Sequence, residues 1–209
     1  MFKKSVFLTI LALTIPFAAF AGSSVDFTNS GGTLSGTSTG LSLSGSSLIA
    51  VDGLNGGGLI TGNDLGTLSF STGDLSTGSL QMGGTFAAGG VFNITGNGSS
   101  GIPTGTIFSG SFTGPVTWTL ITLANGTHNY TLTGSLTGTW SDGTTVSGAT
   151  VQLTINTGKG FFNGSTTISS GDTNFTTSTV PEPGTLGLLG TGLVGVASIV
   201  RRKLKSAIV

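Results

Sequence analysis

A chain of 209 residues with 38 glycines, no cysteine and only 7% charged residues has room for one modest domain and excludes disulfides, thiolate metal sites and cysteine nucleophiles. The formal net charge is zero, but Lys159 is the one base between Gly22 and Val180, where it stands against six aspartates. One minus six leaves this segment with a charge of −5. Nucleic acid is therefore excluded as a partner, because lysine and arginine are what neutralise its phosphates.

Residues 1–21 have the three parts of a secretory signal peptide. Lys3 and Lys4 form a basic start, a mostly apolar stretch follows, and Ala19 and Ala21 supply the small-x-small pattern that precedes a cleavage site. The alternative is an uncleaved membrane anchor, for which the apolar stretch is short. The sequence thus predicts export across the inner membrane and removal of this segment.

Residues 22–168 are predicted to form a β-rich exported domain. Apolar residues are sparse up to about Asn63, where Leu41-Ser-Leu43 and the run 48–51 predict one or two strands before a glycine loop at 56–58. Strands so rich in glycine are expected to bury little surface. After Gly66, short alternating stretches separated by glycine turns recur, as they do in antiparallel sheets.

The clearest local feature of this domain is a hairpin with Asn125-Gly126 at its turn, between the alternating stretches 116–123 and 130–132. Asn-Gly accepts positive φ at both central positions of a type I′ turn, whose twist matches that of the flanking strands. Asp142-Gly143 predicts another turn, and residues 161–168 are predicted to form the last strand of the domain.

Threonine and serine alternate with large apolar residues along these stretches, which predicts a sheet with one wet and one buried face. The predicted fold is all-β, an antiparallel β-sandwich or roll of short strands, because no helical spacing of apolar residues is sustained. A β-solenoid is the alternative, disfavoured because no fixed repeat length is found. Residues 169–179 are polar and are predicted to be a tether, although Phe175 can still pack on the domain.

The segment 180–205 that follows has three parts. The first is a short motif in which two prolines keep the backbone extended: Pro181, Glu182, Pro183 and Gly184. The second is the uncharged stretch 185–200, which predicts one short transmembrane helix. The third is a basic cluster that remains cytoplasmic by the positive-inside rule: Arg201, Arg202, Lys203 and Lys205.

This order of motif, apolar span and basic end resembles the PEP-CTERM sorting signal found in Gram-negative bacteria with an exopolysaccharide-linked envelope system. The resemblance covers residues 180–205, about an eighth of the chain. It implies a membrane-embedded exosortase as processing partner, a membrane contact that can be transient, a destination in the cell envelope or outside the cell, and exopolysaccharide as a candidate partner. A plain single-span anchor with the same topology is the alternative.

The exported domain offers few candidates for chemistry, so no catalytic residue, metal site or cofactor is expected. His128 has only Thr127, Asn129 and Tyr130 as polar neighbours in the sequence, which predicts a surface residue beside the turn rather than a catalytic base. Aspartates at Asp-Gly and Asn-Asp turns are explained by turn geometry and fit no calcium-binding pattern.

Three aromatic residues are candidates for a carbohydrate-stacking platform: Trp118, Tyr130 and Trp140. Aromatic residues in alternating strands belong more often to the core. The chain is therefore expected to be a non-enzymatic envelope or matrix protein with a structural or adhesive role. One alternative is a carbohydrate-binding module on the same fold, and the other is a hydrolase whose aspartates, such as Asp142 and Asp172, meet in space.

Overall fold

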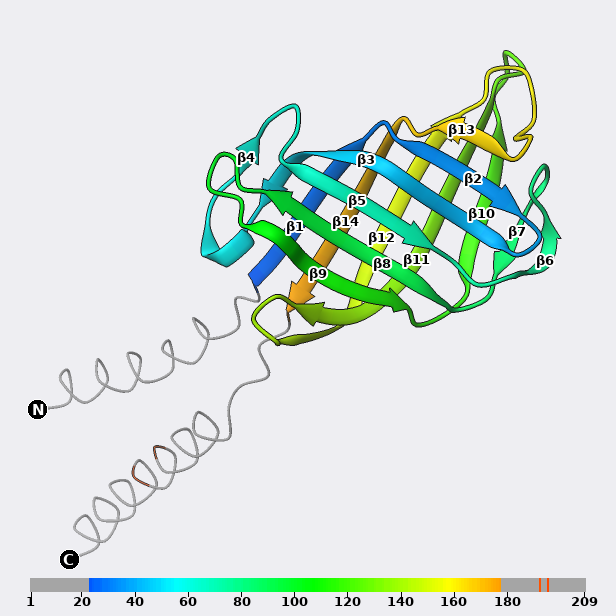
Figure 1. Cartoon of the computed structure of the whole chain (residues 1–209). Coiled ribbons are helices and arrows are strands. Elements are labelled where there is room, and N and C mark those ends of the chain that lie inside the picture. Colours follow the sequence, from blue (N-terminus) through cyan, green and yellow to red (C-terminus); the bar gives the residue numbers. More distant parts are fainter. Residues whose placement is uncertain (1–22, 178–191, 193–194, 196–209) are drawn as a thin grey trace, which may run out of the picture. The chain divides into compact units, whose positions relative to one another are not determined.

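The computed structural model describes residues 23–177, together with Gly192 and Gly195 (Figure 1). The predicted signal peptide, with Ala19 and Ala21, and the predicted segment 180–205, apart from these two glycines, lie outside the described residues. Within the described part, no helix combines the length and the apolar composition needed to cross a membrane. Residues Ser24–Thr176 form one compact unit, and it is all-β, which confirms the predicted class.

A single sheet of 14 strands makes up this unit. One short 3-10 turn, η2 (Leu54–Gly56), interrupts the strands. In chain order the strands are β1 (Ser23–Ser30), β2 (Thr33–Thr37), β3 (Gly40–Asp52), β4 (Ile60–Thr61), β5 (Gly66–Ser71), β6 (Leu75–Ser79), β7 (Gly83–Phe86), β8 (Gly89–Asn97), β9 (Thr104–Phe112), β10 (Val116–Thr122), β11 (His128–Trp140), β12 (Thr145–Asn156), β13 (Ser165–Thr167) and β14 (Ser170–Thr177).

The sheet closes on itself into an antiparallel barrel. Its neighbours follow the order β12-β14-β1-β3-β5-β8-β9-β11, and β11 pairs back with β12 along a register that runs from Asn129↔Asn156 to Thr139↔Thr145. The predicted sandwich or roll is therefore corrected to a closed barrel, because β12 has a partner on both edges and two separate sheets never form. The solenoid alternative is wrong, since strands adjacent in sequence pair antiparallel here.

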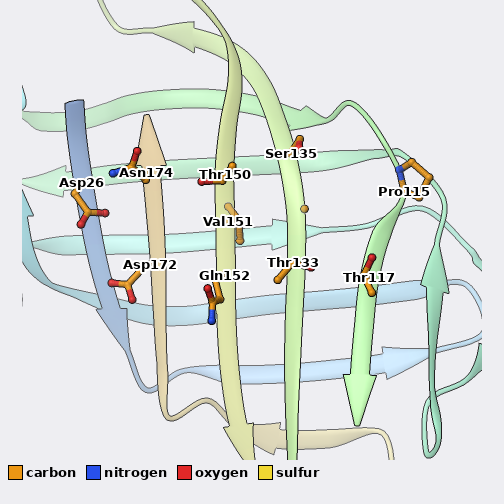
Figure 2. A pocket seen from close by; sticks show the side chains of 11 residues that line it. Asp26, Pro115, Thr117, Thr133, Ser135, Thr150, Val151, Gln152, Asp172 and Asn174 are labelled. Atoms are coloured by element: carbon orange, nitrogen blue, oxygen red, sulfur yellow. The ribbon is translucent and has the colours of Figure 1, made fainter. Parts of the chain in front are cut away.

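Several of the strands are halves of longer, bent ones. β1 and β2 both pair with β3, and β9 and β10 both pair with β11, one half after the other. The bend between β1 and β2 requires glycine, since Gly32 has φ +80° and a Cβ there would lie 2.6 Å from the Ser46 nitrogen. Bends of this kind let the strands of the two walls cross steeply over the core (Figure 2).

The barrel interior is filled by aromatic and aliphatic side chains. Phe70, Phe92 and Phe112 pack at its centre with ring centroids 5.7 to 6.0 Å apart. The glycine-rich first part contributes to this core, contrary to the prediction that it buries little, because the leucines of β2 and β3 alternate onto the inner face. Its buried apolar side chains are Phe27, Leu34, Leu41, Leu43, Leu48 and Val51.

The polar tether predicted at residues 169–179 is wrong, since most of this stretch is β14. Strand β14 pairs with β12 from Thr150↔Asn174 to Thr154↔Ser170, and its Phe175 is fully buried. Only one large apolar residue points inward, so the pattern looks polar in the sequence. The last strand is therefore β14, which extends to Thr177, and not β13.

The predicted hairpin is present, but its turn is not type I′. The Gly126 nitrogen donates to the Leu123 oxygen at 2.9 Å, and of the two turn residues only Gly126 has positive φ, +80°. This geometry is typical of a type I turn followed by a glycine bulge. Asn125 instead uses its side chain, whose Oδ1 accepts a hydrogen bond from the Thr127 nitrogen at 3.0 Å.

Both ends of the described barrel lie at one rim, because β1 begins where its antiparallel neighbour β14 ends (Figure 1). We call this the near rim. At the opposite end, we call the turns at residues 80–82, 123–127 and 157–164 the far rim; the connections at 38–39, 72–74 and 87–88 also lie at this end. Since the sheet closes and the core lies within Ser24–Thr176, this unit has what a domain needs to fold alone.

Candidate functional site

An open groove of about 630 Å³ runs across the outer face of the barrel over β1, β14, β12, β11 and β10 (Figure 2). Its lining is dominated by hydroxyl, amide and carboxylate side chains. These residues are Asp26, Pro115, Thr117, Thr133, Gly134, Ser135, Thr150, Val151, Gln152, Asp172 and Asn174.

Strand register arranges these polar side chains in two rows. Thr117 lies opposite Thr133, Thr133 opposite Gln152, and Gln152 opposite Asp172, which makes a row across four strands. Ser135, Thr150 and Asn174 form the second row in the same way. Neighbouring strands lie about 4.8 Å apart, so the polar groups along each row are separated by about this distance.

Asp26 and Asp172 place two carboxyl groups at one end of the groove (Figure 2). The Asp26 Oδ1 atom is buried and has no hydrogen-bond partner in the described part of the chain. Burial raises the pKa of Asp26 above its ordinary value, and the nearby charge of Asp172 raises it further. The ionised form of Asp26 is therefore disfavoured in the folded protein.

Replacing Asp26 with asparagine is expected to stabilise the protein near pH 7. A carboxyl group with a raised pKa binds more protons when folded than when unfolded, so stability falls as the pH rises through the pKa of the folded state. The melting temperature of Asp26→Asn should exceed that of the wild type at pH 7, and the difference should shrink as the pH falls toward 4. A difference in melting temperature between Asp26→Asn and the wild type that is the same at pH 7 and at pH 4 would contradict this electrostatic explanation.

Asp142 serves as the control for Asp26, because its pKa is shifted in the opposite direction. The Thr144 nitrogen donates a hydrogen bond to Asp142 Oδ1 at 2.8 Å in the β11–β12 turn, and this bond lowers the pKa of Asp142. A lowered pKa contributes stability above the unfolded value that is lost as the pH falls. Asp142→Asn should therefore give no gain at pH 7.

The structure does not bring the three candidate aromatic residues together on the surface. Trp118 and Tyr130 stack on each other at 4.9 Å inside the barrel, with 1% and 0% of their surfaces exposed. Trp140 is half-buried in another part of the core, 4.7 Å from Phe175 and 5.4 Å from Phe108. No ring face of Trp118 or Tyr130 is open to a sugar.

The Tyr130 hydroxyl joins two turns of the far rim. It donates to the Gln81 oxygen at 2.7 Å and accepts from the Phe162 nitrogen at 3.0 Å. The Trp118 indole nitrogen makes a parallel contact with the Leu80 oxygen at 2.9 Å. These two aromatic residues therefore act as braces for the loops above them.

His128 lies at the far rim, where its ring stacks on Phe161 at 4.4 Å and its Nδ1 is 3.0 Å from Thr122 Oγ1. Asp142 lies in a turn that joins β11 to β12, whereas Asp172 lies in the groove, where it meets Asp26. Sequence reasoning missed the pair because residues 169–179 looked like a tether. Among the described residues, no three His, Cys, Asp or Glu side chains converge.

Residues 179–203 match the PEP-CTERM protein-sorting motif. The chain carries a PEP-CTERM sorting motif. This confirms the resemblance seen in the sequence, and the match spans the predicted residues from Pro181 to Lys203, while Lys205 lies beyond it. The motif indicates an exported protein that is sorted to the cell envelope or surface by an exosortase-type enzyme and associates with the membrane. No curated protein and no solved structure matches the chain.

Proposed function

We propose that this PEP-CTERM protein is a non-enzymatic, adhesive component of the cell envelope or extracellular matrix that acts through the outer face of its barrel. Packed side chains fill the barrel interior, so a ligand is expected to bind at the outer surface. The observation that carries the proposal is the pair of polar rows in the groove, held in register by the β-ladder.

The groove suits an extended, uncharged polysaccharide. Polar groups repeat at the strand spacing of about 4.8 Å, close to the length of one sugar ring in an extended chain. Hydroxyls and amides can donate to or accept from sugar hydroxyls, and carboxylates accept strongly from them. Asp26 and Asp172, within a segment of charge −5, disfavour an anionic polymer.

Replacing Thr133 and Gln152 together with alanine is expected to weaken polysaccharide binding about thirtyfold, because each of the two lost hydrogen bonds contributes about 1 kcal/mol. Affinity electrophoresis of residues 23–177 through gels that contain an uncharged β-glucan measures the effect. The matched control is Thr131→Ala with Thr154→Ala, a cross-strand pair on the same two strands outside the groove. Equal retardation of the wild type and both double variants would argue against the groove.

The pair formed by Asp26 and Asp172 favours one second candidate, a hydrolase acting on the same polysaccharide. Glycosidases use two carboxyl groups, of which one has a raised pKa and donates a proton. The raised pKa of Asp26 fits that role. Release of reducing ends that stops in Asp26→Asn would support a hydrolase, whereas binding without release would support the adhesive function.

A further inference from the structure

Exposed apolar side chains gather at the far rim. Six large apolar side chains in the described part of the chain are exposed. Four of them lie on or beside the far-rim turns: Met82 (67% exposed), Ile121 (46%), Leu123 (41%) and Phe161 (47%). The other two, Leu59 and Val91, lie elsewhere on the barrel. The far rim therefore exposes apolar side chains, whereas the lining of the groove is mostly polar.

The far-rim turns are braced from below, so these side chains are held outward. The Tyr130 hydroxyl binds both the 80–82 turn and the 157–164 loop, and the His128 nitrogen donates to the Gly158 oxygen at 2.7 Å. Phe161 rests on the His128 ring at 4.4 Å. Three apolar tips, Met82, Leu123 and Phe161, thus stand on three fixed turns.

The three far-rim turns carry a charge opposite to that of the rest of the barrel, and the acid at the same end, Asp74, lies outside them in the β5–β6 connection. Lys159, the one base between Gly22 and Val180, lies in the 157–164 loop, two residues before Phe161. The three turns contain no aspartate or glutamate, whereas the surrounding segment has six aspartates. Apolar tips beside a base, without an acid, are the combination that suits an anionic lipid surface.

We propose that the far rim docks onto an anionic phospholipid surface, with Met82, Leu123 and Phe161 entering the headgroup boundary and Lys159 contacting lipid phosphate. The sorting motif indicates that the chain associates with the membrane, so lipid is a surface that it meets. A second copy fits less well, since a symmetric contact between two far rims would bring Lys159 toward its own counterpart. Apolar side chains on three separate turns also suit a lipid headgroup layer better than a groove of fixed shape on another protein.

Vesicle flotation tests the proposal with residues 23–177, which contain the far rim and exclude the sorting segment. The wild-type barrel should float with phosphatidylglycerol vesicles and not with phosphatidylcholine vesicles. Replacing Met82, Leu123 and Phe161 with serine should lower the bound fraction at least tenfold. Lys159→Gln should lower it about fivefold at low salt and less at high salt.

The control exchanges the other two exposed apolar side chains, with Leu59→Ser and Val91→Ser combined, and should leave flotation unchanged. Every exchanged residue is exposed, so each variant is expected to fold. Circular dichroism checks that each barrel is folded. Failure of the wild type to float, or an equal loss in the control, would overturn the proposal. So would a wild-type dimer that the far-rim substitutions dissociate without any vesicle binding, since it would identify a second copy as the occupant.

Discussion

Replacing Phe175 with alanine is expected to lower the free energy of unfolding by about 3–5 kcal/mol, the usual cost of removing a buried phenylalanine. The Phe175 ring is fully buried and packs 4.6 Å from Phe108, 4.7 Å from Trp140 and 5.8 Å from Phe27. It lies on β14, which pairs with β12 and is the strand that joins β12 to β1. Urea denaturation of residues 23–177 measures the change.

Phe161→Ala is the matched control, because Phe161 is half exposed and lies outside the strands. Its loss should cost about 1 kcal/mol or less, the range typical of surface positions. A second variant that ends at Ile168 removes β14 entirely and leaves unpaired edges on β12 and β1. If this truncated chain unfolded with the same cooperativity and midpoint as the wild type, residues 170–177 would be a tether after all.

Replacing Tyr130 with phenylalanine is expected to cost about 2–4 kcal/mol, although only one oxygen atom is removed. The buried hydroxyl satisfies the Gln81 oxygen and the Phe162 nitrogen, and each group left without its partner costs about 1–2 kcal/mol. The stack of the ring on Trp118 is retained, so the packing term changes little. Urea denaturation gives the energy, and hydrogen exchange at Phe162 reports whether the 157–164 loop has loosened.

Trp118→Phe provides the comparison for Tyr130→Phe, because it removes the single hydrogen bond to the Leu80 oxygen. That variant should loosen the 80–82 turn while the Phe162 amide stays protected. Equal exchange at Phe162 in the wild type and in Tyr130→Phe would show that the hydroxyl does not brace the far rim, and the fixed position of Phe161 would then lose its support.

The turns of this protein illustrate how far local sequence leads. Asn125-Gly126 and Asp142-Gly143 both mark real turns, since glycine there supplies the positive φ that the chain needs to reverse. The predicted type I′ geometry is wrong, because the turn begins at Leu123, so that Asn125 is its third residue and not the second, as it would be in a two-residue loop. The position of a turn is therefore a local property, while its type depends on how the two strands align.

The groove shows the opposite case. Thr133, Gln152 and Asp172 are widely separated in the sequence, and their outward positions look like an ordinary wet face. They form a row only because β11, β12 and β14 become neighbours in one register. Asp26 joins them from β1 through the closure of the ring, which no pattern within a single stretch records.

By itself, the sequence determined the strand-forming alternation, the all-β class, the places of the main turns and the sorting motif at residues 179–203. The strands and turns depend on the order of neighbouring residues, and the sorting motif depends on the length of apolar chain that a bilayer requires. Only the tertiary structure decided that the sheet closes, that β14 belongs to it, and that Asp26 lies beside Asp172. The reason is that ring closure joins the two ends of the domain, and the energy that selects this pairing comes from packing the shared core around Phe27 and Phe175.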